Sequence, residues 1–292
     1  MTSDTNLIPP GANLELLASG ATWSEGPLWI PEERAVRWSD IPGNRILRWD
    51  AATGSVDVHR DEVEFTNGRA LDRDGSVVQC SHGRRRLERE APDGTLTEIV
   101  ARWEDHRLNS PNDVVVAPDG SYWFTDPDYG IVQPHEGHPG VREYGDCRVF
   151  RWAEEDGLTA VIDDIDRPNG IAFSPGGDTV YVTDTAAGLG DGPGHWIRAY
   201  DVDGAHASGG RHFASIEIGL PDGIAVDVEG RVWSSAGDGI HVFDREGTEV
   251  LFIAVPEVVA NLCFGGDDGT DLFIAATTSL YRIRTATRAA RF

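Results

Sequence analysis

One pattern recurs six times along this chain of 292 residues. In each copy a polar residue, usually followed by glycine, begins a short apolar run, and a second run ends in Ser/Thr-Asp or a variant of it. These six polar residues, here called the leaders, are Glu25, Asn67, Asn112, Asn169, Asp222 and Asn261. They lie 42, 45, 57, 53 and 39 residues apart. A repeat of this length built from short strands is typical of a β-propeller with one blade per copy.

We therefore predict an all-β fold, a six-bladed β-propeller that forms a single domain over residues 1–292. The turns and second strands are predicted at 31–40, 72–82, 117–126, 174–184, 227–236 and 265–276. Alternating runs broken by Asp/Gly turns predict an outer hairpin in each of the first five blades, for example 86–90 with 96–100 in the second and 196–202 with 212–216 in the fourth. The sixth copy has a third strand at 280–284 but no fourth, whereas 13–19 is an unassigned strand. We expect this N-terminal strand to complete the last blade and remove its open edge.

The bulk composition narrows the possible functions. The net charge of −24 argues against nucleic acid or an anionic membrane as a partner. The chain has no lysine, which excludes Schiff-base chemistry and a P-loop lysine. It also has no run of eighteen apolar residues and no secretory signal pattern at its N-terminus. Three widely spaced cysteines, without a CxxC pair, suggest reduced thiols in a cytoplasmic protein.

Four of the leaders are candidates for a metal site. Asn112, Asn169 and Asp222 each follow a proline, which fixes the approach of the chain to them, and Glu25 has Pro27 two positions later. If each leader begins an innermost strand, these side chains point into one central channel. Two carboxylates and two amide oxygens suit one hard divalent ion, Ca²⁺ first, with Mg²⁺ or Mn²⁺ also suited. No leader is histidine, so Zn²⁺ is less favoured. The alternative is that the leaders only form hydrogen bonds across the channel.

Two connections are longer than the usual hairpin loop, and long loops in compact domains are commonly functional. They span residues 126–147 and 184–195, and both follow the second strand of a blade. We expect them to wall the mouth of the channel. The aspartates that end second strands, Asp40, Asp126 and Asp184, are expected to hold loops through hydrogen bonds to the backbone. Asp126 and His82, also at the end of a second strand, are in addition candidates for substrate contact.

Several ordered motifs resemble one known family. They are Ser-Glu-Gly-Pro-Leu-Trp (24–29), Leu-Asn-Ser-Pro-Asn-Asp-Val-Val-Val (108–116), Phe-Thr-Asp-Pro-Asp-Tyr-Gly (124–130), Arg-Pro-Asn-Gly-Ile-Ala-Phe (167–173) and Leu-Pro-Asp-Gly-Ile (220–224). Together they resemble the gluconolactonase branch of the senescence-marker-protein/regucalcin family over about residues 10 to 284. The resemblance implies a six-bladed propeller with one metal ion held by Glu25, Asn112, Asn169 and Asp222. It also implies that Asp222 is the general base.

On this reading the protein is a metal-dependent lactonase, in which the metal polarises the carbonyl of a sugar lactone or related small cyclic ester. The regucalcin branch has an arginine at the position of Ser110, so the substrate does not carry over directly. The predicted substrate-binding residues are His82, Asn109, Asn112, Asp126 and Tyr129. The alternatives are a phosphotriesterase-like hydrolase and a calcium-binding propeller without enzymatic activity. The protein is expected to be a monomer or a small homo-oligomer.

Overall fold

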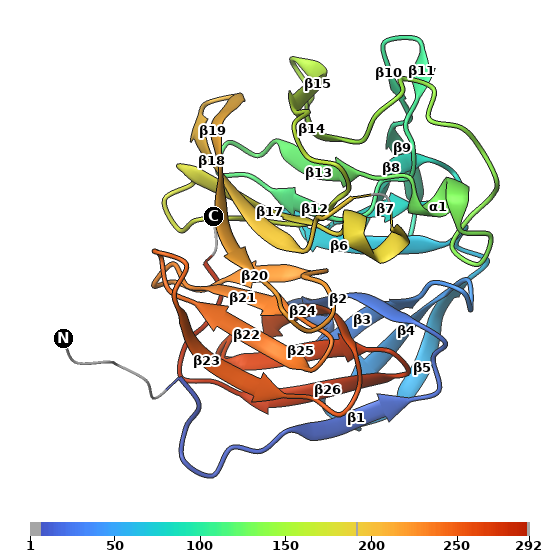
Figure 1. Ribbon diagram of the computed structural model, residues 1–292. Coiled ribbons are helices and arrows are strands. Elements are labelled where there is room, and N and C mark those ends of the chain that lie inside the picture. The colour runs from blue at the N-terminus through green and yellow to red at the C-terminus, as the bar shows by residue number, and fades with distance from the viewer. Residues whose placement is uncertain (1–6, 191, 291–292) are drawn as a thin grey trace.

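The computed structural model describes residues 7–190 and 192–290, so the outermost residues of the predicted domain and Asp191 lie outside it. Over these ranges the chain forms six four-stranded antiparallel sheets, the blades, arranged around a central axis (Figure 1). The prediction of an all-β, six-bladed propeller is therefore confirmed. Within the described residues, helix is limited to α1 (Tyr129–Val132) and the 3₁₀ turns η1 (Pro31–Glu33) and η2 (Ala186–Leu189).

Each blade runs from an innermost strand at the axis to an outermost strand. Blades 1 and 2 contain β2 (Ser24–Ile30), β3 (Ala35–Asp40), β4 (Arg45–Asp50), β5 (Val56–Asp61), β6 (Thr66–Leu71), β7 (Val77–Ser81), β8 (Arg86–Glu90) and β9 (Leu96–Val100). Blades 3 and 4 contain β12 (Val114–Val116), β13 (Tyr122–Asp126), β14 (Arg148–Ala153), β15 (Gly157–Ile162), β16 (Pro168–Phe173), β17 (Thr179–Asp184), β18 (Trp196–Asp203) and β19 (His206–Ser215). Blade 5 contains β20 (Ile224–Val226), β21 (Val232–Ser235), β22 (Gly239–Phe243) and β23 (Glu249–Ala254). A small extra hairpin, β10 (Arg102–Trp103) with β11 (His106–Arg107), follows blade 2.

The sixth blade joins the two ends of the chain. Its strands β24 (Val259–Gly265), β25 (Asp271–Ala276) and β26 (Ser279–Arg284) are completed by β1 (Glu15–Ser19), which pairs antiparallel with β26. The predicted closure by the N-terminal strand is thus confirmed. Beyond β26 the chain was expected to carry no strand, and over residues 285–290 it makes one isolated bridge, from Ala289 to Asp227. This closure pairs the edge of β26, which would otherwise be open to other chains.

The core lies between the faces of neighbouring blades. The tryptophans of three second strands, Trp38, Trp123 and Trp233, are at most 1% exposed. Between blades 6 and 1, the rings of Phe273 and Trp29 stack with their centroids 5.6 Å apart. Each buried aromatic side chain removes roughly 150–250 Å² from water, so these layers hold the blades together around the axis.

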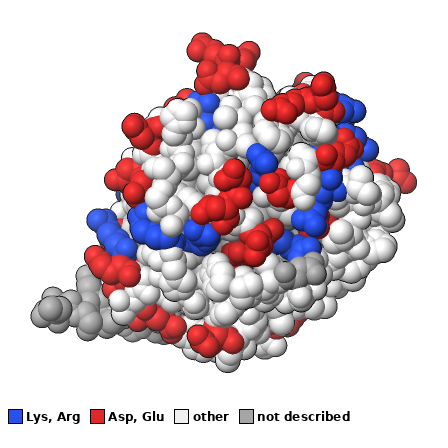
Figure 2. All heavy atoms as spheres, turned by 45° about the horizontal axis from the view of Figure 1, so that its top comes forward, with Lys and Arg blue, Asp and Glu red and all other residues white. Residues whose placement is uncertain are grey.

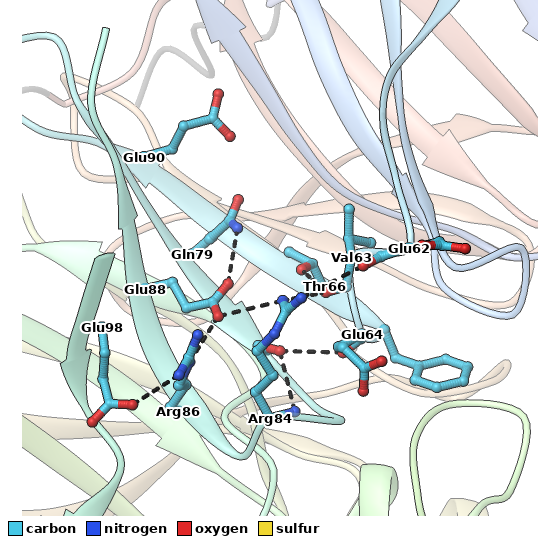
Figure 3. A network of polar contacts seen from close by, with 12 residues as sticks. Glu62, Val63, Glu64, Thr66, Gln79, Arg84, Arg86, Glu88, Glu90 and Glu98 are labelled. Atoms are coloured by element: carbon cyan, nitrogen blue, oxygen red, sulfur yellow. Dashed lines mark hydrogen bonds and ion pairs between the residues drawn. The ribbon is translucent and has the colours of Figure 1, made fainter. Parts of the chain in front are cut away.

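A buried polar network fixes the second blade (Figure 3). The Glu88 carboxylate is fully buried and accepts hydrogen bonds from Gln79 Nε2 at 3.2 Å, Arg86 Nε at 2.8 Å and Arg84 Nη1 at 3.4 Å. Arg84 Nη1 also donates to the Val63 carbonyl oxygen at 3.1 Å. A buried carboxylate is tolerated only when it is paired in this way. The network ties the outer part of the blade to the segment that leads into its innermost strand.

Acidic and arginine side chains are interspersed on the face of the molecule shown in Figure 2. Over the whole chain, 49 acidic residues outnumber 25 arginines. No helix among the described residues is long and apolar enough to cross a membrane.

Candidate active site and metal centre

The leaders lie where the pairing of the innermost strands is interrupted. The register shifts beside Glu25 in β2, Asn67 in β6, Asn169 in β16 and Asn261 in β24. The other two leaders, Asn112 and Asp222, lie two residues before β12 and β20. A bulge bends a strand and redirects its side chains, and bulges are frequent beside active sites. The leaders are therefore at the starts of the innermost strands, as expected, but not in regular strand geometry.

The aspartates that end second strands hold the approach to the leader of their own blade. Asp40 Oδ1 accepts a hydrogen bond from the backbone N–H of Trp23 at 3.3 Å, two residues before Glu25. Asp126 accepts the N–H groups of Asn109 at 2.7 Å and Ser110 at 2.8 Å, just before Asn112. The Asp184 carboxylate likewise accepts the N–H of Arg167, just before Asn169. The predicted role of these aspartates as loop anchors is confirmed.

The hydroxyl residue before each of these aspartates reaches the next blade. Ser39 Oγ donates to the carbonyl oxygen of Asn67 at 2.9 Å, and Thr125 Oγ1 donates to that of Asn169 at 2.6 Å. Thr183 Oγ1 donates to the carbonyl oxygen of Asp222 at 2.8 Å. The Ser/Thr-Asp dipeptide therefore positions two leaders, one in its own blade and one in the following blade.

Two of the glycines that follow leaders are required by the closeness of the next blade. A Cβ on Gly170 would lie 2.3 Å from the carbonyl oxygen of Asp222. A Cβ on Gly223 would lie 2.2 Å from the side chain of Asn261. No side chain fits at these distances, which explains why Gly commonly follows the leader in the repeat.

Five leaders meet in one cavity of about 180 Å³ at one end of the channel. Its wall is formed by Trp23, Glu25, Ile41, Asn67, Asn112, Tyr129, Gln133, Glu136, Asn169, Thr185, Gly188, Leu189, Leu220 and Asp222. All four residues of the predicted metal set are among them, and so is Tyr129. The two long loops both contribute, the first through α1 and the residues after it, and the second through η2. The expectation that these loops wall the mouth is confirmed.

The two carboxylates of the predicted metal set are strongly perturbed. Burial raises the pKa of Glu25 to about 8, although Glu25 Oε2 accepts hydrogen bonds from Gly26 N–H at 2.8 Å and Asn261 Nδ2 at 3.1 Å. Burial raises the pKa of Asp222 well above its usual value, and the charge of Glu25 raises it further. Two buried acids that repel each other resist ionisation unless a positive charge lies between them.

A divalent cation fits these residues. Within the described residues no cluster of three or more His, Cys, Asp and Glu side chains is arranged to hold a metal, so a site here must include amide oxygens. Asn112 and Asn169 supply such oxygens beside Glu25 and Asp222 in the same cavity. An all-oxygen set is what Ca²⁺ prefers, with about six to eight oxygens around the ion. A cation would also relieve the repulsion between the two carboxylates.

A second layer of charge lies toward the other end of the channel. Asp113 and Arg69 line a cavity of about 640 Å³ there. Its walls are formed mainly by residues of the innermost strands that follow the leaders in the sequence. Burial raises the pKa of Asp113 to about 7. Arg69 is 6% exposed, and its guanidinium donates to the Gly26 carbonyl oxygen at 2.6 Å and to Ser39 Oγ at 2.5 Å. Arg69 therefore holds the backbone directly after Glu25.

His82 lies behind the cavity wall. Its Nδ1 is 3.1 Å from the Glu136 carbonyl oxygen and its Nε2 is 3.3 Å from Asn67 Nδ2. Burial lowers the pKa of His82 to about 4, so the ring is neutral. With a carbonyl beside Nδ1 and an amide N–H beside Nε2, the proton belongs on Nδ1. His82 thus joins the first long loop to the leader Asn67.

Asn109 and Asp126 are also absent from the cavity wall. The Asp126 carboxylate is occupied by the two backbone N–H groups described above and by the Tyr144 hydroxyl, and Asn109 Nδ2 donates to the Asp146 carbonyl oxygen at 2.9 Å. Tyr129 does reach the cavity, and its hydroxyl contacts Thr185 Oγ1 in the second long loop. Of the predicted substrate-binding residues, the structure therefore brings Asn112 and Tyr129 to the cavity.

Two cavity residues of chemical interest were not singled out from the sequence. Trp23 stands two residues before Glu25. Side chains two residues apart in an extended chain lie on the same side, so this spacing was a signal that could have found Trp23. Glu136 lies in the first long loop, and no sequence pattern marks it as a cavity residue. Burial raises the pKa of Glu136 to about 7.

The fold and the ring of leaders define a propeller with an acidic, amide-lined site at one end of its channel. The chain belongs to the SMP-30/Gluconolactonase/LRE-like family, whose model matches residues 23–278.

Its relatives are similar along most of their lengths. Gluconolactonase from Zymomonas mobilis is 29% identical over 94% of this chain and 82% of its own length. Pentonolactonase XacC from Haloferax volcanii is 32% identical over 86% of this chain and 80% of its own. The solved structure of a gluconolactonase from Xanthomonas campestris has a TM-score of 0.91 at 39% identity, covering 98% of this chain and 93% of that one.

Proposed function

We propose that this protein hydrolyses a sugar lactone or a related small cyclic ester, with one divalent cation, Ca²⁺ first, held by Glu25, Asn112, Asn169 and Asp222. The observation that carries the proposal is that these four residues, from four blades, line one cavity in a chain whose relatives include lactonases of two sugar acids. When bound, the cation would polarise the ester carbonyl and stabilise the negative charge that develops on it.

The chain's own groups supply the rest of the reaction. Water attacks the carbonyl carbon, the ring C–O bond breaks, and the product is an open-chain hydroxy acid. Asp222 accepts the proton of the attacking water and returns it to the ring oxygen as the C–O bond breaks. It suits this role because it lines the cavity and its backbone is held at both ends by Ser235 Oγ and Thr183 Oγ1. Such placement of a base is typically worth about 10²–10⁴ in rate.

The remaining predicted residues orient these groups and the substrate. Asn112 and Tyr129 are proposed to contact the lactone from the cavity wall. Asn109, Asp126 and His82 are proposed to act from behind that wall, by holding Asn112 and the first long loop. A location in the cytoplasm is proposed as well, which the unpaired thiols of Cys80, Cys147 and Cys263 support.

The proposal is tested with Asp222→Asn, which keeps the size of the side chain but cannot accept the proton. After chelation and re-addition of Ca²⁺, Mg²⁺, Mn²⁺ or Zn²⁺, we expect the wild type to hydrolyse one or more aldonolactones. The variant should lose about 10²-fold or more in kcat/KM. Asp201→Asn is the matched control, because the Asp201 side chain is 67% exposed on an outer strand.

Substantial lactone hydrolysis by metal-saturated Asp222→Asn would remove Asp222 as the base. A phosphotriester assayed on the same preparation separates the phosphotriesterase-like alternative from the lactonase. Metal binding without turnover of either substrate class would instead support a calcium-binding propeller.

A further inference from the structure

Trp23 occupies a distinct place in the cavity. It directly precedes β2 and lines the cavity together with Glu25, two residues later. Its backbone is fixed on both sides, since its N–H donates to Asp40 Oδ1 at 3.3 Å and its carbonyl oxygen accepts the Ile41 N–H at 3.1 Å. The backbone that carries the indole is therefore held by Asp40, the same aspartate that anchors the approach to Glu25.

Trp23 differs from the other eight tryptophans of the chain. Seven of them contact another aromatic or imidazole ring, and these are Trp29, Trp49, Trp103, Trp123, Trp152, Trp196 and Trp233. Trp38 is fully enclosed in the core, at 1% exposure. Trp23 is only partly buried, and within the described residues its side chain has no ring contact and no hydrogen bond. Its ring is thus available to whatever enters the cavity.

The rest of the cavity wall restricts the shape and chemistry of that ligand. Ile41, Leu189 and Leu220 extend the apolar surface around Trp23. A polar group without a partner is present too, because within the described residues Asn67 Oδ1 is buried with no hydrogen bond. Buried acceptors of this kind are normally satisfied by hydroxyl donors or by water. A space of about 180 Å³ suits one ring with short substituents and not a long acyl chain.

We propose that Trp23 is the platform for the apolar face of a single polyhydroxylated lactone ring, whose edge hydroxyls meet the polar part of the wall, including Asn67 Oδ1. The proposal rests on the function proposed above and narrows its substrate class to single-ring sugar lactones. A sugar ring presents C–H groups on its face and hydroxyls at its edge, so it matches a wall that is part aromatic and part polar. Trp23 is on this reading a substrate-binding residue that takes no part in proton transfer.

The test compares Trp23→Ala, Trp23→Phe and the wild type, with Trp196→Phe as the control on an outer strand. For the aldonolactone that the wild type hydrolyses best, Trp23→Ala should raise KM about tenfold, as expected for removing one buried aromatic contact, while kcat and Ca²⁺ affinity change little. Trp23→Phe should recover part of the loss. A lactone with an eight-carbon acyl side chain should be a poorer substrate than the aldonolactone.

A binding measurement decides the proposal independently of turnover. Titration with the corresponding aldonate product should quench tryptophan fluorescence in the wild type and in Trp196→Phe, and should not do so in Trp23→Phe. Unchanged KM in Trp23→Ala, or equal quenching in Trp23→Phe and the wild type, would overturn the role of Trp23. If the wild type hydrolyses no lactone, the proposed function fails, and the titration still decides whether Trp23 contacts a sugar acid.

Discussion

The buried acid Glu25 should make the stability of the metal-free protein depend on pH. Its pKa of about 8 in the folded state lies above the ordinary value of 4.5, so the folded protein holds a proton there that the unfolded chain releases. The resulting stabilisation is complete below about pH 4.5 and is lost as the pH rises to about 8. In the presence of a chelator, we therefore expect the midpoint temperature of thermal unfolding to decrease as the pH is raised from about 5 to about 8. Differential scanning calorimetry measures this decrease.

Two controls connect that decline to the proposed metal site. Glu25→Gln cannot ionise, so its midpoint should fall less steeply over the same range. Saturating Ca²⁺ should flatten the decline in the wild type, because a bound cation favours the ionised carboxylates. An identical slope in wild type and Glu25→Gln would show that another group controls the dependence.

At the scale of single residues, the sequence predicted those site residues that occupy the same place in each copy of the repeat. The leaders Glu25, Asn112, Asn169 and Asp222 were found because each occupies the same place in its copy and three follow a proline. Glu136 belongs to no repeated position, so only the folded chain shows that it lies in the cavity, whereas Trp23 could have been found from its place two residues before Glu25. The burial of Asp126 and His82 behind the wall likewise depends on how the long loop folds over them.

At the scale of the strands, Thr183 at the end of β17 should be needed to hold Asp222. Its hydroxyl accepts the Gly170 N–H at 2.7 Å and donates to the Asp222 carbonyl oxygen at 2.8 Å. Thr183→Val keeps the shape but removes both of these hydrogen bonds, so that only the 3.1 Å bond between the Gly170 N–H and the Asp222 carbonyl oxygen remains. The loss of two hydrogen bonds should cost about 1–3 kcal/mol of unfolding free energy in urea titrations. It should also weaken Ca²⁺ binding measured by calorimetry, because the backbone of a proposed ligand loses its anchor.

The conservative change Thr183→Ser restores the hydroxyl and should recover most of the Ca²⁺ affinity. Thr159→Val serves as the control, since Thr159 is an exposed residue of β15. Wild-type Ca²⁺ affinity in Thr183→Val would show that Asp222 does not depend on this contact between blades.

The strands themselves were largely predictable, with one instructive exception. Strand β8 was predicted at its observed bounds, whereas β19 was expected from residue 212 and begins at His206. The added part of β19 is mostly exposed at the outer edge of its blade and has no apolar alternation to reveal it. The bulges beside the leaders were also unforeseen, because they depend on pairing between strands and not on residue type alone.

For the whole molecule, closure of the ring by β1 should be essential to stability. Deleting residues 1–19 removes the partner of β26 and exposes its edge. We expect a lower thermal midpoint and the appearance of higher oligomers in light scattering, since an unpaired edge strand recruits other chains. Glu15→Gln, which removes only the exposed ion pair with Arg282, should leave both measurements close to wild type.

The meeting of β1 and β26 in one sheet also means that the ring has no structural beginning. The Leu7 carbonyl oxygen accepts the Ala286 N–H at 2.8 Å, so the two ends of the described chain run beside each other. A circularly permuted gene, with a short linker between the old ends and new ends in the exposed turn between β4 and β5, would retain all six blades. In that protein blade 6 would be continuous and the order of the four proposed metal ligands along the chain would change, yet the cavity that they line should be the same.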